Sequence, residues 1–141
     1  GRINIAARGA GMAKGATNMA LHYAMERKTF GKTIAEHQAI QLKLAEMSTR
    51  AAAAELLVHQ AAKKFDQQER CDLEAGQAKF FASEAAVQNS LDAMRVFGGY
   101  SYSPDYEIER FYRDAPLLCI GEGTNEIQRM IIAKQMVARA G

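Results

Sequence analysis

The 141 residues are enough for one domain with a single hydrophobic core. Apolar residues make up 48% of the chain and charged residues 24%, which is typical of a folded globular protein and not of a disordered one. The 18 basic and 16 acidic residues are interleaved, so we expect no basic stripe for nucleic acid. No run of about eighteen apolar residues occurs, so we expect no membrane span.

The two cysteines and the start of the sequence indicate where the protein works. Cys71 and Cys119 are far apart in sequence, which predicts neither a disulfide framework nor a metal knuckle. A reducing compartment, the bacterial cytoplasm or the mitochondrial matrix, is the expectation. The sequence begins at Gly1 without methionine and without the apolar run of a signal peptide, so we expect a piece of a longer chain.

Apolar residues recur at helical spacing in four long segments. We expect helices over about Arg2–Glu26, His37–Asp66, Asp72–Val96 and Asn125–Ala138. The first contains three glycines, each of which costs roughly 1 kcal/mol against alanine, so we expect close helix packing there. Thr124 is a suitable N-cap for the last helix, whose expected core residues are Ile127, Met130, Ile131 and Met136.

The connections contain turn residues and no strand pattern of useful length. We expect a loop over Lys28–Glu36, an irregular segment over Tyr100–Asp105, and a short helix over about Tyr106–Arg113. Pro116 and Gly121 then indicate another loop. Helices joined by short connections predict an all-α fold, an antiparallel up-and-down four-helix bundle.

One segment has the composition of a catalytic loop. Glu122 lies between Gly121 and Gly123, directly before the last helix. The glycines let a ligand approach the backbone, and the helix start offers free N–H groups, so a general base here is chemically reasonable. On spacing alone, a solvated loop glutamate near a helix start is the simpler explanation of the pattern.

Two further segments have the composition of a ligand site. Arg27, Thr29 and Phe30, with Gln38 downstream, could hold a phosphate and stack on a ring; the alternative is a helix C-terminal cap. Gly98-Gly99 follows Arg95 and could simply end a helix. The three histidines show no spacing typical of metal ligands, so we expect no metal.

Read together, these segments resemble the acyl-CoA dehydrogenase family. Residues 26–31 (ERKTFG), with His37-Gln38 downstream, are similar to the family's ERxxFG…HQ pattern, and residues 95–102 (RVFGGYSY) to its QxxGGxGY-like element. Arg113-Asp114-Ala115, followed by residues 122–129 (EGTNEIQR), resembles RDA…EGTxEIQR. The motifs occur in order and cover nearly the whole chain, which makes the resemblance specific.

The resemblance implies a three-part flavoenzyme of fatty acid metabolism. Residues 1–141 would be its C-terminal helical bundle, without the family's N-terminal helical and middle β domains. The family binds FAD, oxidises acyl-CoA substrates and forms homotetramers, dimers of dimers. An electron-transfer flavoprotein is the implied electron acceptor.

The resemblance also assigns roles to residues. Glu122 matches the catalytic base that removes the α proton while the β hydrogen leaves as hydride to flavin N5. Residues matched to cofactor binding are Arg27, Thr29, Phe30, Gln38, Arg95, Gly99, Thr124 and Glu126; the first four would contact the FAD of a neighbouring subunit. Residues matched to substrate binding are Arg2, Gly121 and Gly123.

Departures from the family pattern concern the substrate. Many relatives carry tyrosine before the glutamate, where this chain has Gly121, a change that would widen the acyl pocket. Some branches place the base one residue before Arg2, a position that is Gly1 here and cannot serve.

Two alternatives remain at this stage: a non-catalytic oligomerisation bundle, or a decarboxylating or oxidase relative of the same family. Since the domain alone lacks most of the flavin platform, we expect it to be inactive by itself.

Overall fold

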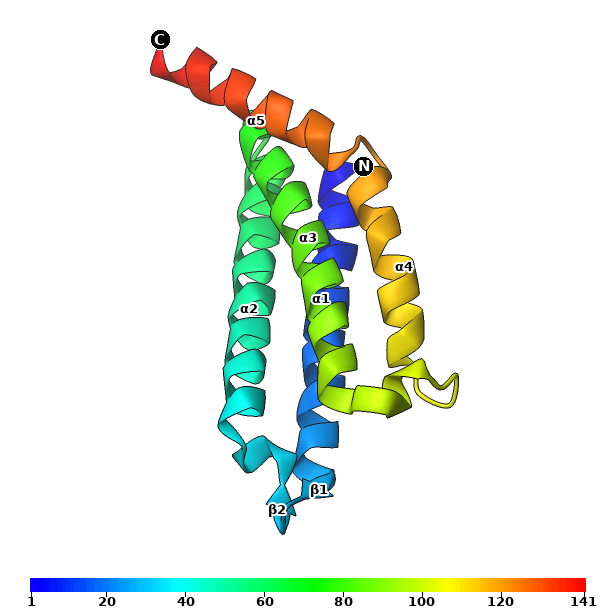
Figure 1. Ribbon diagram of the computed structural model, residues 1–141. Helices are drawn as coiled ribbons and strands as arrows, with labels where there is room; N and C mark the ends of the chain where they lie inside the picture. The colour runs from blue at the N-terminus through cyan, green and yellow to red at the C-terminus, as the bar shows by residue number, and fades with distance from the viewer.

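The computed structural model describes residues 1–141 as five α-helices with short connections (Figure 1). The helices are α1 (Arg2–Glu26), α2 (Gln38–Asp66), α3 (Asp72–Phe97), α4 (Ile108–Ile120) and α5 (Asn125–Ala140). Helices α1 to α4 run alternately in opposite directions, and α5 lies across the end of the bundle at which α1 begins (Figure 1). The predicted all-α, up-and-down four-helix bundle is therefore confirmed, although its fourth member is α4 and the predicted last helix, α5, lies outside it. No helix has both the length and the apolar character needed to cross a membrane.

The predicted loop over Lys28–Glu36 contains a small hairpin. Strands β1 (Lys28–Thr29) and β2 (Lys32–Thr33) pair antiparallel, and the 3₁₀ helix η1 (Ile34–Glu36) follows them. Two-residue strands are too short to produce an alternating pattern, so the sequence does not predict them. A second 3₁₀ helix, η2 (Gly98–Tyr102), joins α3 to α4.

The fourth helix is longer than the sequence predicts. It continues through Pro116 to Ile120, so the placement of Pro116 in a loop is wrong. Proline removes one backbone hydrogen bond inside a helix. Burial of Ala115 and Leu118 on either side of it holds the segment helical nonetheless.

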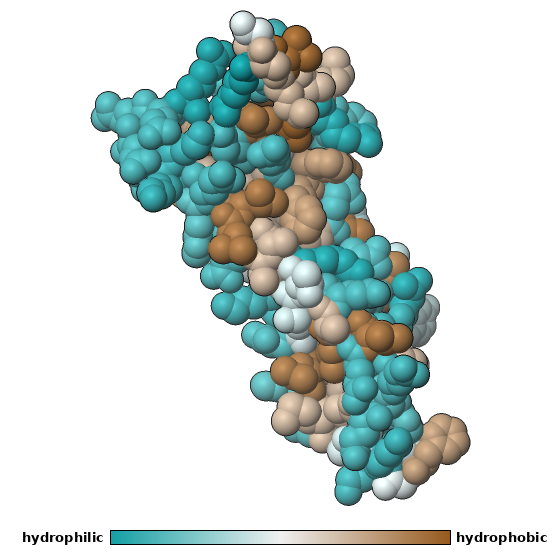
Figure 2. Space-filling view, turned by 90° about the vertical axis from the view of Figure 1, so that its left-hand side faces the viewer, coloured by the Kyte–Doolittle hydropathy of each residue, from teal (hydrophilic) through white to brown (hydrophobic).

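The predicted core face of the last helix is also wrong. Ile127, Met130 and Met136 are 47%, 68% and 56% exposed. Because α5 crosses the bundle end instead of joining the bundle, its buried residues are polar: Asn125, Gln128 and Gln135. Apolar residues are also exposed on α2, and Figure 2, in which α2 faces the viewer, shows apolar patches between hydrophilic regions.

Small side chains fill the space between α1, α2 and α3. The larger buried cluster is almost entirely alanine, so the helix backbones approach closely. At Gly9 an added Cβ would lie 2.7 Å from the carbonyl oxygen of Ala82 in α3. At Gly11 it would meet nothing within 4 Å. The predicted close packing is thus present at Gly9 and absent at Gly11.

These two glycines form a matched pair for a stability test. We expect Gly9→Ala to lower the free energy of unfolding by about 1–2 kcal/mol, because the α1–α3 spacing must widen against backbone atoms. Gly11→Ala should raise it by up to about 1 kcal/mol through helix propensity alone. Urea unfolding followed by circular dichroism measures both; equal effects of the two variants would contradict the packing argument.

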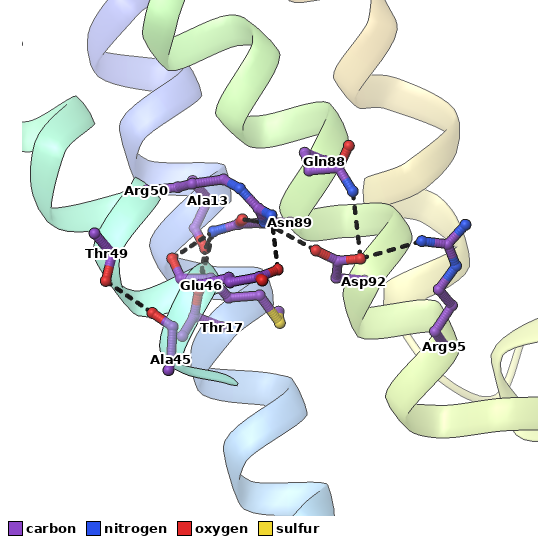
Figure 3. Close-up of polar contacts among 11 residues, drawn as sticks. Ala13, Thr17, Ala45, Glu46, Thr49, Arg50, Gln88, Asn89, Asp92 and Arg95 are labelled. Atoms are coloured by element: carbon purple, nitrogen blue, oxygen red, sulfur yellow. Dashed lines mark hydrogen bonds and ion pairs between the residues drawn. The ribbon is translucent and has the colours of Figure 1, made fainter. Parts of the chain in front are cut away.

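A buried polar cluster fixes the register of the same three helices (Figure 3). The side-chain amide of Asn89 in α3 donates to the backbone oxygens of Met47 in α2 (2.9 Å) and Ala13 in α1 (3.2 Å). Arg50 in α2 donates to the Asn89 side-chain oxygen (2.9 Å) and to Asp92 Oδ2 (2.8 Å). Since each of these buried groups has a partner, sliding one helix along another would leave some unsatisfied.

The C-terminal end of α5 is held by a buried carboxylate. Glu74 in α3 accepts two hydrogen bonds from Arg139 (2.8 and 3.1 Å) and one from Lys64 (2.8 Å). The bonds from Arg139, with the smaller contribution of Lys64, overcome the effect of burial and lower the pKa of Glu74 to about 2.

This shift predicts a pH-dependent stability. The lowered pKa of Glu74 contributes stability that is complete above about pH 4.5 and is lost as the pH falls toward 2. We expect Glu74→Gln to cost roughly 2–3 kcal/mol at pH 7 and little near pH 2. Urea unfolding across this range measures the difference. Glu55→Gln, which removes a 4.0 Å surface pair with Lys14, is the control and should change little at any pH.

Candidate functional site

The loop that carries Glu122 has an unusual backbone. Glu122 and Gly123 both have positive φ, +57° and +87°, between the end of α4 and the start of α5. The left-handed region is unfavourable for a residue with a Cβ, so the surroundings must hold Glu122 in place. Thr124 caps α5, its hydroxyl accepting from the N–H of Ile127 at 3.3 Å, which confirms the predicted N-cap.

The carboxylate of Glu122 lies against the start of α1. A Cβ built at Gly1 would overlap Glu122 Oε2 and would lie 3.0 Å from Cδ. Residue 1 and the Glu122 carboxylate are therefore adjacent in space, and the absence of a side chain at Gly1 leaves room for the carboxylate. Glu122 is exposed in this domain.

Arg2 lies next to this site but is paired elsewhere. Its guanidinium donates to Asp72 Oδ1 (2.9 Å) and to the backbone oxygen of Asp72 (3.3 Å) at the start of α3. It lines a hollow of about 480 Å³ between α1, α2 and α3 that also includes Gly1. In this arrangement Arg2 ties α1 to α3 beneath the Glu122 loop.

Gln128 holds the loop from inside. Its side-chain amide nitrogen donates to the backbone oxygens of Gly123 (3.2 Å) and Glu122 (3.4 Å). A Cβ at Gly123 would lie 2.7 Å from that nitrogen, so both the space and the positive φ require glycine there. Sequence reasoning did not select Gln128; the available signal was a polar residue one turn into α5.

Glu126 lies in the first turn of α5 and is exposed. Its own backbone N–H lowers the pKa of the Glu126 carboxyl, and the Thr124 hydroxyl adds to this effect. Glu126 therefore keeps a negative charge beside the loop. Gly121 has ordinary extended dihedral angles and leaves the approach to Glu122 without a side chain.

A second group of predicted residues meets at the other end of the bundle. Arg27 after α1, Thr29 in β1 and Gly99 in η2 line one cavity of about 500 Å³ together with Tyr100 and Phe97. The Arg27 guanidinium lies over the ring of Tyr100, 5.6 Å from its centroid. Thr29 shares a 2.9 Å hydrogen bond with His37 Nε2. A cation, a hydroxyl, an aromatic ring and an open glycine backbone thus converge from three segments.

Three other predicted residues lie near this cavity without lining it. Phe30, at φ +53° on the hairpin tip, is 96% exposed. Gln38 is exposed at the first residue of α2. Arg95, near the end of α3, is 3.4 Å from Asp92 Oδ1 and its side chain is 54% exposed.

The two groups lie at opposite ends of α1. The 25 residues of this helix span about 37 Å at 1.5 Å per residue. One chain therefore does not bring Glu122 and Arg27 to the same place. The fold therefore places a carboxylate loop and a cationic, aromatic cavity at opposite ends of one helical body.

Comparison with known proteins identifies this class of helical domain. The family model described as "Acyl-CoA dehydrogenase, C-terminal domain" matches residues 1–137. The chain belongs to that family, as its motifs indicated.

Named relatives agree with this assignment. The chain is 50% identical over 137 residues to a 3-(aryl)acrylate reductase of Clostridium sporogenes, covering 97% of this chain and 36% of the relative. It is 42% identical over 139 residues to the caffeyl-CoA reductase-Etf complex subunit CarC of Acetobacterium woodii (99% and 37%). The structure of butyryl-CoA dehydrogenase from Megasphaera elsdenii superimposes with a TM-score of 0.95 at 38% identity, covering 96% of this chain and 36% of that one. The chain thus spans little more than a third of the length of these proteins.

Proposed function

We propose that this chain is the C-terminal domain of an FAD-dependent acyl-CoA dehydrogenase in which Glu122 is the catalytic base. One observation carries the proposal: the exposed carboxylate of Glu122 is held in a left-handed loop over the side-chain-free start of α1. That loop begins the EGTNEIQR segment (residues 122–129), which resembles the family's EGTxEIQR element.

The reaction divides between the protein and its cofactor. Glu122 would take the α proton of the acyl group, which the adjacent thioester carbonyl makes removable. FAD, when bound, supplies the hydride acceptor for the β hydrogen. The backbone N–H of Glu122 is suited to donate to the thioester oxygen as negative charge develops there.

The residues of the far cavity fit a dinucleotide cofactor. Arg27 can bond two oxygens of a pyrophosphate, and Tyr100 offers a ring beside it. Gly99 has no atom within 4 Å of an added Cβ, so its backbone is open to the adenosine part. Phe30 projects from the hairpin tip, where it could contact the flavin of another subunit.

Two copies are needed to complete each site in this proposal. The Glu122 loop and the Arg27 cavity, here called half-sites, lie at opposite ends of a helix about 37 Å long. The cavity of one subunit would therefore hold the adenosine end of the flavin whose reactive ring lies beside Glu122 of another. A dimer of dimers satisfies this requirement, and exposed apolar residues such as Leu56 and Phe81 supply surface for such contacts.

The wider assignment follows the relatives. The Acetobacterium relative is named as part of an Etf complex, and we propose an electron-transfer flavoprotein as partner here. The proposed location is a reducing compartment, the bacterial cytoplasm or the mitochondrial matrix, in which the two free cysteines of this domain would remain thiols. Gly121 leaves room beside the base, and the Clostridium relative is named for an aryl-substituted acrylate. Ring-bearing acyl-CoA thioesters therefore belong beside straight-chain ones among candidate substrates.

The cofactor assignment predicts the effect of Arg27→Gln. We expect the full-length variant to retain FAD about 10- to 100-fold less tightly, because one bidentate, charge-assisted contact is lost. Equilibrium dialysis with flavin fluorescence measures the change. Lys14→Gln, which removes a surface cation on α1, should leave FAD affinity unchanged; equal losses in both variants would contradict a specific role of Arg27.

The proposal is tested by anaerobic mixing of the full-length holoenzyme with acyl-CoA thioesters of varied length, branching and ring content. Bleaching of the oxidised flavin by at least one thioester is the expected result. A purely structural bundle would show none with any of them. If flavin reduction by the thioester depends on Glu122, this domain takes part in the reaction. Flavin reduction that does not depend on Glu122 would come from chemistry elsewhere in the protein.

A further inference from the structure

The loop that carries Glu122 is anchored by a lysine that the proposed reaction does not use. Lys79 in α3 has 0% exposed surface and is the largest fully buried side chain. Burial lowers the pKa of Lys79, while Cys119, Glu126 and Glu84 act in the opposite direction. A buried amine requires a hydrogen-bond partner, and the partner here is the first residue of α5.

Asn125 links that lysine to the catalytic loop. Its side-chain oxygen accepts from Lys79 Nζ at 2.8 Å and from Ser83 Oγ at 3.2 Å. Its side-chain nitrogen donates to Ser83 Oγ (2.9 Å) and to Glu84 Oε1 (2.8 Å). Asn125 is only 2% exposed, so α3 fixes the start of α5 three residues after Glu122.

Gln128 completes the support from the next turn of α5. It is 1% exposed and bonds the backbone oxygens of Glu122 and Gly123. Glu122 itself has φ +57°, in the left-handed backbone region that is unfavourable for a residue with a Cβ. The buried side-chain amides of Asn125 and Gln128 therefore both hold the loop of the strained residue in place.

We infer that Lys79, acting through Asn125, and Gln128 are positioning residues that hold the Glu122 loop in its left-handed conformation and so set the geometry of proton abstraction. This inference rests on the proposed function of Glu122. None of the three residues needs to touch substrate. Each acts by keeping the carboxylate where it faces the start of α1.

Lys79→Met is a suitable variant, because methionine has similar length and removes the amine without a large cavity. The side-chain nitrogen of Asn125 keeps both of its acceptors, Ser83 Oγ and Glu84 Oε1, and replacing a buried charge with an apolar residue of similar size is often neutral for folding. Gln128→Met removes the loop contacts independently. Glu74→Gln is the matched control, since it releases the opposite end of α5 without touching the loop.

The experiment uses the full-length holoenzyme and a thioester that reduces the parent flavin. In Lys79→Met and Gln128→Met we expect the limiting rate of flavin reduction to fall about 10- to 100-fold, with thioester affinity unchanged. Hydrogen–deuterium exchange at residues 121–127 should speed up in both. Glu74→Gln should keep the parent reduction rate and the parent exchange at this loop.

Parent-like reduction and loop exchange in a folded Lys79→Met protein would overturn the role of Lys79. If that variant does not fold, Gln128→Met decides by the same two measurements. Losses of rate and loop protection in Glu74→Gln as large as in the loop variants would also overturn the inference, because general loosening of α5 would then suffice. A different result would contradict the proposed function itself: in the Glu122→Gln variant, the thioester would reduce the flavin at the parent rate.

Discussion

Glu122→Gln in the full-length protein is expected to slow flavin reduction by acyl-CoA about 10³-fold or more, with FAD still bound. Glutamine keeps the size and the hydrogen-bonding shape of the side chain but cannot accept the α proton. A positioned general base contributes about 10²- to 10⁴-fold. FAD is retained because Arg27 and its cavity lie at the other end of α1.

Stopped-flow absorbance of the oxidised flavin measures this rate, and the flavin-to-protein ratio checks cofactor retention. Glu55→Gln, an exposed carboxylate on α2, is the control and should reduce at the parent rate. A Glu122→Gln enzyme within about tenfold of the parent would remove Glu122 as the base, since that loss is too small for the general base itself.

Moving the base from the loop to α1 is expected to restore part of the lost activity. In the Glu122→Gly background, Gly1→Glu should raise the reduction rate by about tenfold or more over Glu122→Gly alone. The reason is geometric: the Cβ of residue 1 would occupy the place of the Glu122 carboxylate. Its own carboxylate therefore starts beside the original position but is displaced from it, so recovery should be incomplete.

The matched variant for this test is Gly1→Gln in the same background. It fills the same space without a base and should give no recovery, and stopped-flow measurement with one thioester compares all three proteins. Equal rates with glutamate and glutamine at residue 1 would show that the two positions do not serve one reaction centre.

Local periodicity explains why the long helices could be predicted from the sequence. Helix α1 has the predicted bounds, and α2 and α3 differ from them by one residue, because an apolar face recurs over seven or more turns. The path of α5 could not be predicted in this way. Three of its apolar residues are exposed (Ile127, Met130 and Met136), whereas its buried residues are polar (Asn125, Gln128 and Gln135), since it crosses the bundle end instead of running along it.

The candidate site shows the same division. Glu122, Thr124 and their glycines are adjacent in sequence, so the motif and the N-cap were visible there. The support of the loop joins Asn125 to Lys79, 46 positions earlier, and local sequence gives no sign of that contact. The sequence shows Gln128 only as a polar residue of the last helix. Because the apolar side of that helix was predicted to face the core, the pattern gave no reason to expect a buried glutamine.

The distance between the half-sites has a consequence for how such a protein would behave on dilution. If one flavin is bound by two subunits at once, the apparent affinity for FAD depends on how tightly the two subunits associate. Loss of colour and loss of quaternary structure then become a single event, and protein concentration itself regulates how much active enzyme is present.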